Sequence, residues 1–453
     1  MDKLPTELMH LVVSRCSCRL SSLAAVSRQW QDVVESRTMA SVKLYYRREA
    51  SSVELFDRTF SAPRRRRLLR KLEYFISMPA SLTVASAVYR DGVLELFSCL
   101  QHWGEEARIR LEVAGSCEGM HLSSDTLICL MLVDDNRRET ILPTVQAVIG
   151  IVVNGLPCIY PTALGTMTRA LPRLEELTAQ AYWPGRRLNL PSLPSTIRNL
   201  FATVGFDTPF PHLTSFKMHW PDMDSLKNSF RPISFVDDSG RDRLSLALRR
   251  ISQLPTLRHF EITGQPVIGP ELFVVDNEDG DSSWPSLRTM VVEASFAAPD
   301  GTRYFTSTLK GSDEPNPELD DGASTWLWRD RPDPNTFNPF LLSITRAVLA
   351  MPALQTLRVS LHMKGNCQSF LAEFLAPGTV GVAHKTRPDF EITKFDSIYR
   401  GQRRWVVILD PPRELVTGEE EGSAWEVPEA IKAAWKASVD DRVFLCMEDR
   451  VEL

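Results

Sequence analysis

The sequence has no hydrophobic run long enough to cross a lipid bilayer and no excess of positive charge. Its most hydrophobic runs, LICLMLV and AVIGIVV, are much shorter than the roughly 18 apolar residues of a membrane-spanning helix. Asp2 stands near the N-terminus, and no apolar signal core follows it. A net charge of -5 argues against bulk attraction to nucleic acid or anionic lipid. We therefore expect an intracellular protein, in the cytoplasm or the nucleus, with neither nucleic acid nor a membrane among its partners.

The motifs of common catalytic, nucleotide and metal sites are also missing. The sequence contains no G-x-S-x-G nucleophile motif and no G-x-x-x-x-G-K phosphate loop. Its 8 cysteines show no paired zinc spacing, and in the acidic turn DNEDGD Gly280 stands where a calcium loop needs an oxygen ligand. We expect no catalytic residue, no metal and no cofactor, and we expect buried, reduced thiols. An enzyme hidden in the chain is the weakest alternative.

What the chain does have is enough apolar sequence for a sizeable core. It has 453 residues, of which 43% are hydrophobic and 24% are charged. Single hydrophobic cores seldom grow beyond roughly 250 to 300 residues, so more than one domain is expected.

The first forty residues predict a short amphipathic helical unit. Pro5 suits the first turn of a helix, because its missing N–H would have no intrahelical partner there. A second helix, capped by Ser21 or Ser22, is expected to follow. Apolar residues recur at helical spacing on both helices: Leu8, Leu11 and Val12, then Leu23, Val26, Trp30 and Val33. So small a unit is marginal alone, and either the following domain or a partner protein must cover its apolar face.

The order of these residues resembles the F-box, the adaptor-binding module of Skp-cullin-F-box (SCF) ubiquitin ligases. The similarity lies in LPTEL, an apolar spacer, and LAAVSRQWQDVV followed by MASVKL, and it covers residues 1–44. It implies that one face docks on a Skp-type adaptor and, through it, on a cullin. Leu8 and Leu11 stand where isoleucine is commoner, which keeps both anchors apolar. The resemblance assigns adaptor binding to Leu4, Pro5, Leu8, Leu11, Leu23, Val26, Ser27 and Trp30.

A second pattern repeats beyond residue 44. An apolar residue and a proline introduce the phrase L-x-x-Φ-x-Φ, where Φ is apolar, and the proline predicts a helix end, a turn and then a strand. Amphipathic helices are expected before two of the phrases, over 243–253 and 340–350. The phrases are LPRLEELTA (Leu174, Leu177), LPSTIRNLFA (Ile197, Leu200), FPHLTSFKM (Leu213, Phe216), LPTLRHFEI (Leu257, Phe260), WPSLRTMVV (Leu287, Met290) and MPALQTLRV (Leu354, Leu357).

This unit is similar to a leucine-rich repeat, and most of the chain looks like fungal F-box proteins with degenerate leucine-rich repeats. The resemblance implies an α+β/α/β fold, in which a small all-α F-box precedes an irregular leucine-rich-repeat-like α/β solenoid with a parallel sheet. The copies are unevenly spaced, and the Asn or Cys usual after the phrase is absent. An ordinary α/β domain with buried apolar strands is the alternative.

These patterns predict four regions. The F-box occupies 1–44, an α/β connecting region 45–140, the repeat-like region 141–410, and a closing segment 411–453. A surface insertion rich in Pro, Gly and Asp is expected at 297–338. The closing segment should contain a helix with an apolar face of Ile431, Ala434, Trp435 and Val439.

One basic run leaves two interpretations open. Six of the eight residues from Arg64 to Lys71 are basic, as in nuclear localisation signals. Leu68, Leu69 and Leu72 nevertheless share one face, so composition favours the solvated side of an ordered element.

The expected function is therefore that of a non-catalytic, substrate-recruiting subunit of an SCF-type ubiquitin ligase. The F-box would bind the adaptor, and the repeat region would bind a target protein that the sequence does not identify. A non-ligase scaffold that carries the same helices is the alternative.

Overall fold

The structure is a computed structural model, and it has two compact units. Residues Met1–Gln180 with Thr208–His212 form the first unit, and Ala181–Asp207 with Leu213–Leu453 form the second. The structure describes residues 4–16, 20–47, 50–79, 82–117, 140–155, 160–181, 193–206, 209–220, 233–275, 284–306, 331–362, 369–379, 402–410, 425, 427–438, 443–447 and 450–452.

The first unit opens with three helices where the sequence predicted two. They are α1 (Thr6–Arg15), α2 (Leu20–Ala24) and α3 (Arg28–Thr38). The predicted second helix is interrupted after Ala24, and Val26 lies in the turn. Ser27 then caps α3, because its hydroxyl accepts a hydrogen bond from the Trp30 N–H at 3.4 Å. Pro5 also differs from its predicted place, since it precedes α1 as the capping residue and not as part of the first turn.

A sheet follows within the same unit. Its strands are β1 (Ser41–Arg47), β2 (Ala50–Ser51), β3 (Lys71–Met78), β4 (Ile109–Cys117), β5 (Val148–Gly155) and β6 (Glu176–Gln180). β1, β3, β4, β5 and β6 pair in that order and in parallel, and β2 pairs antiparallel with β1. The connecting helices are α4 (Val53–Thr59), α5 (Pro63–Leu68), α6 (Leu82–Leu100) and α7 (Pro161–Arg169).

The second unit repeats this arrangement. Its strands are β7 (Ser215–His219), β8 (His259–Thr263), β9 (Thr289–Ser295), β12 (Thr356–His362), β13 (Ser369–Leu375), β14 (Arg404–Asp410), β15 (Val443–Met447) and β16 (Arg450–Glu452), with the small pair β10 (Phe305–Thr306) and β11 (Arg331–Pro332) outside the main sheet. β7, β8, β9 and β12 are parallel neighbours, and β13 reverses direction.

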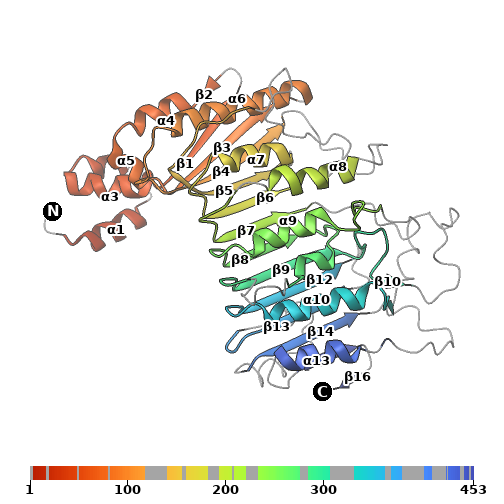
Figure 1. The fold of residues 1–453 in the computed structure, drawn as a ribbon. Coiled ribbons are helices and arrows are strands. Elements are labelled where there is room, and N and C mark those ends of the chain that lie inside the picture. The colour runs from red at the N-terminus through yellow and green to blue at the C-terminus, as the bar shows by residue number, and fades with distance from the viewer. Residues whose placement is uncertain are drawn as a thin grey trace, which may run out of the picture. The chain divides into compact units, whose positions relative to one another are not determined.

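Helices cover one face of this sheet. They are α8 (Leu193–Leu200), the π-helix η1 (Phe201–Gly205), α9 (Arg243–Ser252), the 3-10 helix η2 (Pro270–Phe273), α10 (Phe337–Leu349) and α13 (Glu429–Ser438). α9, α10 and α13 lie on the same side of the strands (Figure 1). The predicted apolar faces of α9 and α10 are buried, and so are Ile431 and Trp435 of α13. Val439 lies outside the described residues. The chain is thus a mixed α/β protein with large, mostly parallel sheets.

Five of the six repeated phrases form the predicted turn and strand. They lead into β6, β7, β8, β9 and β12. Burial alternates along β7 and β8, so that Phe216 and Phe260 stack on the covered face with ring centroids 5.4 Å apart. The phrase LPSTIRNLFA is the exception: the prediction of a strand there was wrong, because these residues form α8 and the start of η1.

Backbone hydrogen bonds between successive turns hold these strand starts in register. The N–H of Thr289 donates to the Arg258 carbonyl at 3.0 Å, and the N–H of Thr356 donates to the Arg288 carbonyl at 3.0 Å. The N–H of His259 likewise donates to the Thr214 carbonyl at 3.1 Å. Each turn therefore satisfies a backbone group of the turn beside it.

A buried ion pair joins α8 to the start of α9. The Arg198 guanidinium nitrogens lie 2.5 Å and 3.2 Å from the carboxylate oxygens of Asp242, and both side chains are almost fully buried. Asp242 also caps α9 by accepting from the N–H groups of Leu244 and Ser245. Phe235 packs its ring 5.0 Å from the Arg198 guanidinium carbon. An ion pair as well as side-chain packing therefore connects α8, the helix that replaces a predicted strand, to α9.

Two of the predicted boundaries fall within ordered elements of the structure. The predicted F-box boundary at residue 44 falls inside β1, whose first residues already pair with β3. The predicted surface insertion at 297–338 is not a surface segment at its ends, because Ala297, Tyr304 and Phe337 are all buried. Residues 307–330 of that insertion lie outside the described residues.

Candidate partner-binding surface

The three N-terminal helices enclose a small core of their own. The spacing of four residues between Met9 and Val13 places both on one side of α1, where they meet the inward side of α3. The buried members are Met9, Val13, Trp30, Val33 and Val34, and the half-buried side chains that pack against them are Leu4, Leu20, Leu23 and Ala24. This core includes several residues that the sequence assigned to a partner.

A strip of apolar side chains remains exposed on these helices. Leu8, Leu11 and Val12 of α1 are 46%, 53% and 39% exposed, and Val26 in the turn before α3 is 50% exposed. Met9 and Val13 take the inward side of α1, which turns Leu8, Leu11 and Val12 away from the core. The name "apolar strip" is used below for Leu8, Leu11 and Val12, which share one side of α1.

The predicted adaptor-binding residues therefore divide into two groups. Pro5, Leu8, Leu11 and Val26 are exposed, whereas Leu4, Leu23, Ser27 and Trp30 are half-buried or buried. Trp30 is only 4% exposed, so in this structure it stabilises the helices and offers no surface to a partner. Its indole Nε1 is buried, and no described residue accepts its hydrogen bond.

Three residues of α1 were not predicted from the sequence to have the roles that the structure gives them. Met9 and Val13 form the inward side of α1, and their spacing of four residues is the signal that could have identified them. Val12 was placed on the apolar face but not among the adaptor-binding residues, and it is exposed beside Leu8 and Leu11.

The basic run after α4 fastens α3 to the rest of the first unit. The guanidinium nitrogens of Arg64 and Arg65, both on α5, lie 3.2 Å and 3.0 Å from carboxylate oxygens of Glu35 on α3. Arg64 also pairs with Asp32. The ordered interpretation of this run is confirmed, because Pro63–Leu68 is a helix and Leu69 and Leu72 are buried. A role as a nuclear signal stays a prediction.

The environment of Glu35 favours its charged form. Burial by itself raises the pKa of this carboxyl. Hydrogen bonds from Gln31 and Arg65, together with the positive charges of Arg65 and Arg64, outweigh burial and lower the pKa below its usual value. Glu35 therefore stays ionised and holds both arginines at neutral pH.

The uncovered faces of the two sheets carry charged side chains, and that of the first unit also carries the exposed Tyr45. In the first unit Lys71 bridges Glu73 and Glu112 at 2.8 Å and 2.9 Å, and Tyr45, which is 57% exposed, stacks on Phe75. In the second unit the Lys217 ammonium lies 2.6 Å from Glu261. Such faces suit polar contacts with another protein.

Several kinds of site are missing from the part of the chain that the structure describes. Over these residues no group of three or more His, Cys, Asp or Glu side chains is placed to hold a metal ion. Within the same ranges, no helix is both long enough and apolar enough to cross a bilayer. The side chains of Cys16 and Cys99 are partly exposed, which differs from the buried thiols that the sequence suggested.

Comparison with known proteins gave no family. No protein-family model matches the chain, and no curated protein matches it.

Proposed function

We propose that this chain is the substrate-recruiting subunit of an SCF-type ubiquitin ligase. In this proposal residues 1–44 are an F-box, and the apolar strip docks on a Skp-type adaptor that connects the chain to a cullin. The observation that carries the proposal is the strip itself: Leu8, Leu11 and Val12 are exposed although the helices already have a closed core, and Val26 is exposed in the turn before α3. Exposed apolar clusters of this kind mark interaction surfaces.

The proposal assigns no bond chemistry to this chain. The ubiquitin-charged enzyme of the complex would perform the transfer, and the chain would contribute by holding a target near it, which raises the effective concentration of the reacting groups. The complex would act inside the cell, in the cytoplasm or the nucleus.

The same proposal treats the rest of the chain as an irregular leucine-rich-repeat-like solenoid. Supporting it are the parallel strands in chain order, the turns that lead into them and the backbone bonds between successive turns. The target protein would bind to this region.

Co-purification with a Skp-type adaptor tests the proposal. The full chain should bind, and a Leu8→Asp, Leu11→Asp variant should lose at least about 2 kcal/mol of binding free energy, or roughly 30-fold in affinity. Leu55→Asp is the matched control, because Leu55 lies on α4 of the same unit, is 64% exposed and is outside the strip. Equal binding by wild type and the double variant would contradict the proposal.

The second candidate is a scaffold that binds the adaptor without ubiquitination of any target. Reconstitution of the complex with cullin and the ubiquitin-charged enzyme distinguishes the two. Ubiquitin transfer to a protein captured by the chain supports the ligase subunit, and adaptor binding without transfer to any captured protein supports the scaffold.

A further inference from the structure

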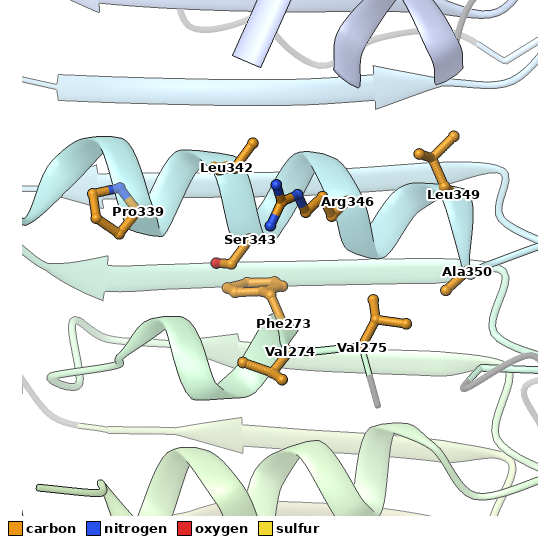
Figure 2. Close-up of a pocket in the computed structure, with 9 residues that line it drawn as sticks. All are labelled: Phe273, Val274, Val275, Pro339, Leu342, Ser343, Arg346, Leu349 and Ala350. Atoms are coloured by element: carbon orange, nitrogen blue, oxygen red, sulfur yellow. The ribbon is translucent and has the colours of Figure 1, made fainter. Parts of the chain in front are cut away.

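The second unit has an open groove on its helical side. Figure 2 shows its two walls: α10 forms one wall, and the end of η2 with the two residues after it forms the other. The groove has a volume of about 700 Å³, within the usual range for ligand sites. We name it the α10 groove; it is lined by Phe273, Val274, Val275, Pro339, Leu342, Ser343, Arg346, Leu349 and Ala350.

The walls of the α10 groove are fixed by packing beneath it. The Phe273 ring meets the Phe340 ring edge to face, with centroids 5.9 Å apart, and both side chains are fully buried. Arg249 of α9 donates to the Val274 carbonyl at 3.3 Å, which anchors the opposite wall. A bound molecule would thus meet a preformed surface and would not have to order it.

The surface that the groove presents is apolar with one positive charge. Val274 and Leu349 are 39% and 53% exposed, so both present apolar surface to the groove. Arg346 is exposed between Leu342 and Leu349 along α10, and none of the described residues forms an ion pair or hydrogen bond with it. Among the described residues that line the groove, none is acidic. An occupant with apolar groups and a negative charge would complement it.

The size of the groove limits the kind of occupant. Nine described residues line it, whereas an interface between two folded proteins uses roughly 20 to 30 residues on each side. A short peptide segment can fill such a site with one or two side chains and place a third on the rim.

We infer that the α10 groove binds a short acidic and aliphatic peptide segment of the target protein. Aliphatic side chains of that segment pack on Val274, Leu342 and Leu349, and its carboxylate pairs with Arg346. The inference rests on the proposed function in one respect, since it names the part of the target that the chain recognises. It places this contact on the helical side of the second unit and not on the open face of the sheet.

Binding of synthetic peptides to the full chain tests the inference. Three sets of fluorescent peptides carry the same aliphatic residues. At the remaining positions the acidic set has Asp and Glu, the neutral set has Asn and Gln, and the Lys set has Lys. Fluorescence anisotropy should show the acidic set binding about 2- to 5-fold more tightly than the neutral set, because solvent screens an ion pair with an exposed arginine. Higher salt should weaken the acidic set most.

Two variants locate the binding. Arg346→Glu should weaken the acidic set by about 10-fold or more and favour the Lys set, and Leu349→Asp should weaken all three sets. Arg250→Glu is the matched control, because Arg250 is an exposed arginine on α9 outside the groove. Circular dichroism on each variant checks folding. Unchanged affinity in Arg346→Glu overturns the inference, as does the absence of binding by every set.

The remaining occupants are also distinguished. Sedimentation that shows a dimer in wild type and a monomer in Arg346→Glu, without peptide binding, would identify a second copy and overturn the inference. Peptide binding could also appear only after the acidic residues that follow Val275 are made neutral, namely Asp276, Glu278, Asp279 and Asp281. That result would overturn the inference as well. Adaptor co-purification with the same proteins separates the two proposals: adaptor binding without peptide binding defeats only this one, and the reverse result defeats only the F-box assignment.

Discussion

The carboxylate of Glu35 accepts a hydrogen bond from Arg65 at 3.0 Å, although the two residues are 30 positions apart in the sequence. Glu35 belongs to α3, the helix that contributes Trp30 to the small N-terminal core, and Arg65 belongs to α5, which leads into β3. The contact therefore couples the helices that carry the apolar strip to the sheet of the first unit.

Replacing Glu35 should weaken that coupling. Glu35→Gln removes the charge that holds Arg64 and Arg65, and because both arginines are partly exposed we expect a loss of about 1 to 2 kcal/mol of unfolding free energy. Urea unfolding of the full chain measures it. Glu54→Gln is the control, since its pair with Arg58 is highly exposed and should contribute less than about 0.5 kcal/mol. Equal unfolding curves for wild type and Glu35→Gln would show that the contact contributes no stability.

The same pair should make stability depend on pH. The pKa of Glu35 in the folded chain lies below its usual value of 4.5, so the folded state binds a proton less readily than the unfolded state. The stability that this group contributes is present above pH 4.5 and is lost as the pH falls through the folded-state pKa. The difference in unfolding midpoint between wild type and Glu35→Gln should therefore be full at neutral pH and shrink in acid. A difference that grows in acid would contradict the sign of this shift.

Trp30 should matter through stability more than through adaptor contact. Trp30→Ala empties a buried site between α1 and α3, and substitutions of this kind cost about 3 to 5 kcal/mol. Hydrogen exchange of the N-terminal helices should show the loss, with increased exchange across all three. Leu11→Ala, on the exposed side of α1, should change stability by less than about 0.5 kcal/mol. Stable helices in Trp30→Ala would mean that its burial contributes little to this core.

The buried pair between Arg198 and Asp242 should behave as a unit. Asp242→Asn leaves the Arg198 charge buried without its counterion, and we expect a loss of about 3 to 5 kcal/mol in unfolding free energy. Arg198→Met alone should also destabilise, while the double variant should cost less than the sum of the two. Simple addition of the two losses in urea unfolding would show that the charges are not coupled.

Part of the fold was predictable because its signals are local. A proline followed by alternating apolar residues, as in the stretch around Leu213 and Phe216, gives a turn and a half-buried strand almost regardless of context. LPSTIRNLFA has the same proline, but Ile197 and Phe201 are four residues apart and both are buried, which is helical spacing. The prediction of a strand relied on the shared phrase and did not take this helical spacing into account.

The candidate surface was predictable only in part, for a different reason. α1 has apolar residues on two sides, Met9 with Val13 and Leu8 with Leu11, and either side could have turned inward. Which side turns inward depends on how α3 packs against α1, and the break in the helix before Ser27 determines that packing. Periodicity along one helix does not encode it, so Trp30 was assigned to the surface and Met9 was overlooked.

The reversal of β13 has a consequence for how this chain could have lengthened. At β8, β9 and β12, the strand begins at a turn whose N–H groups donate to a carbonyl of the preceding turn. β13 runs the other way and places its last residue, Leu375, opposite Thr356, so the series of matching turns ends there. Duplication of a repeat can therefore be accommodated before β12, where each copy presents the same acceptor to the next, whereas a copy added after β13 would find no matching edge.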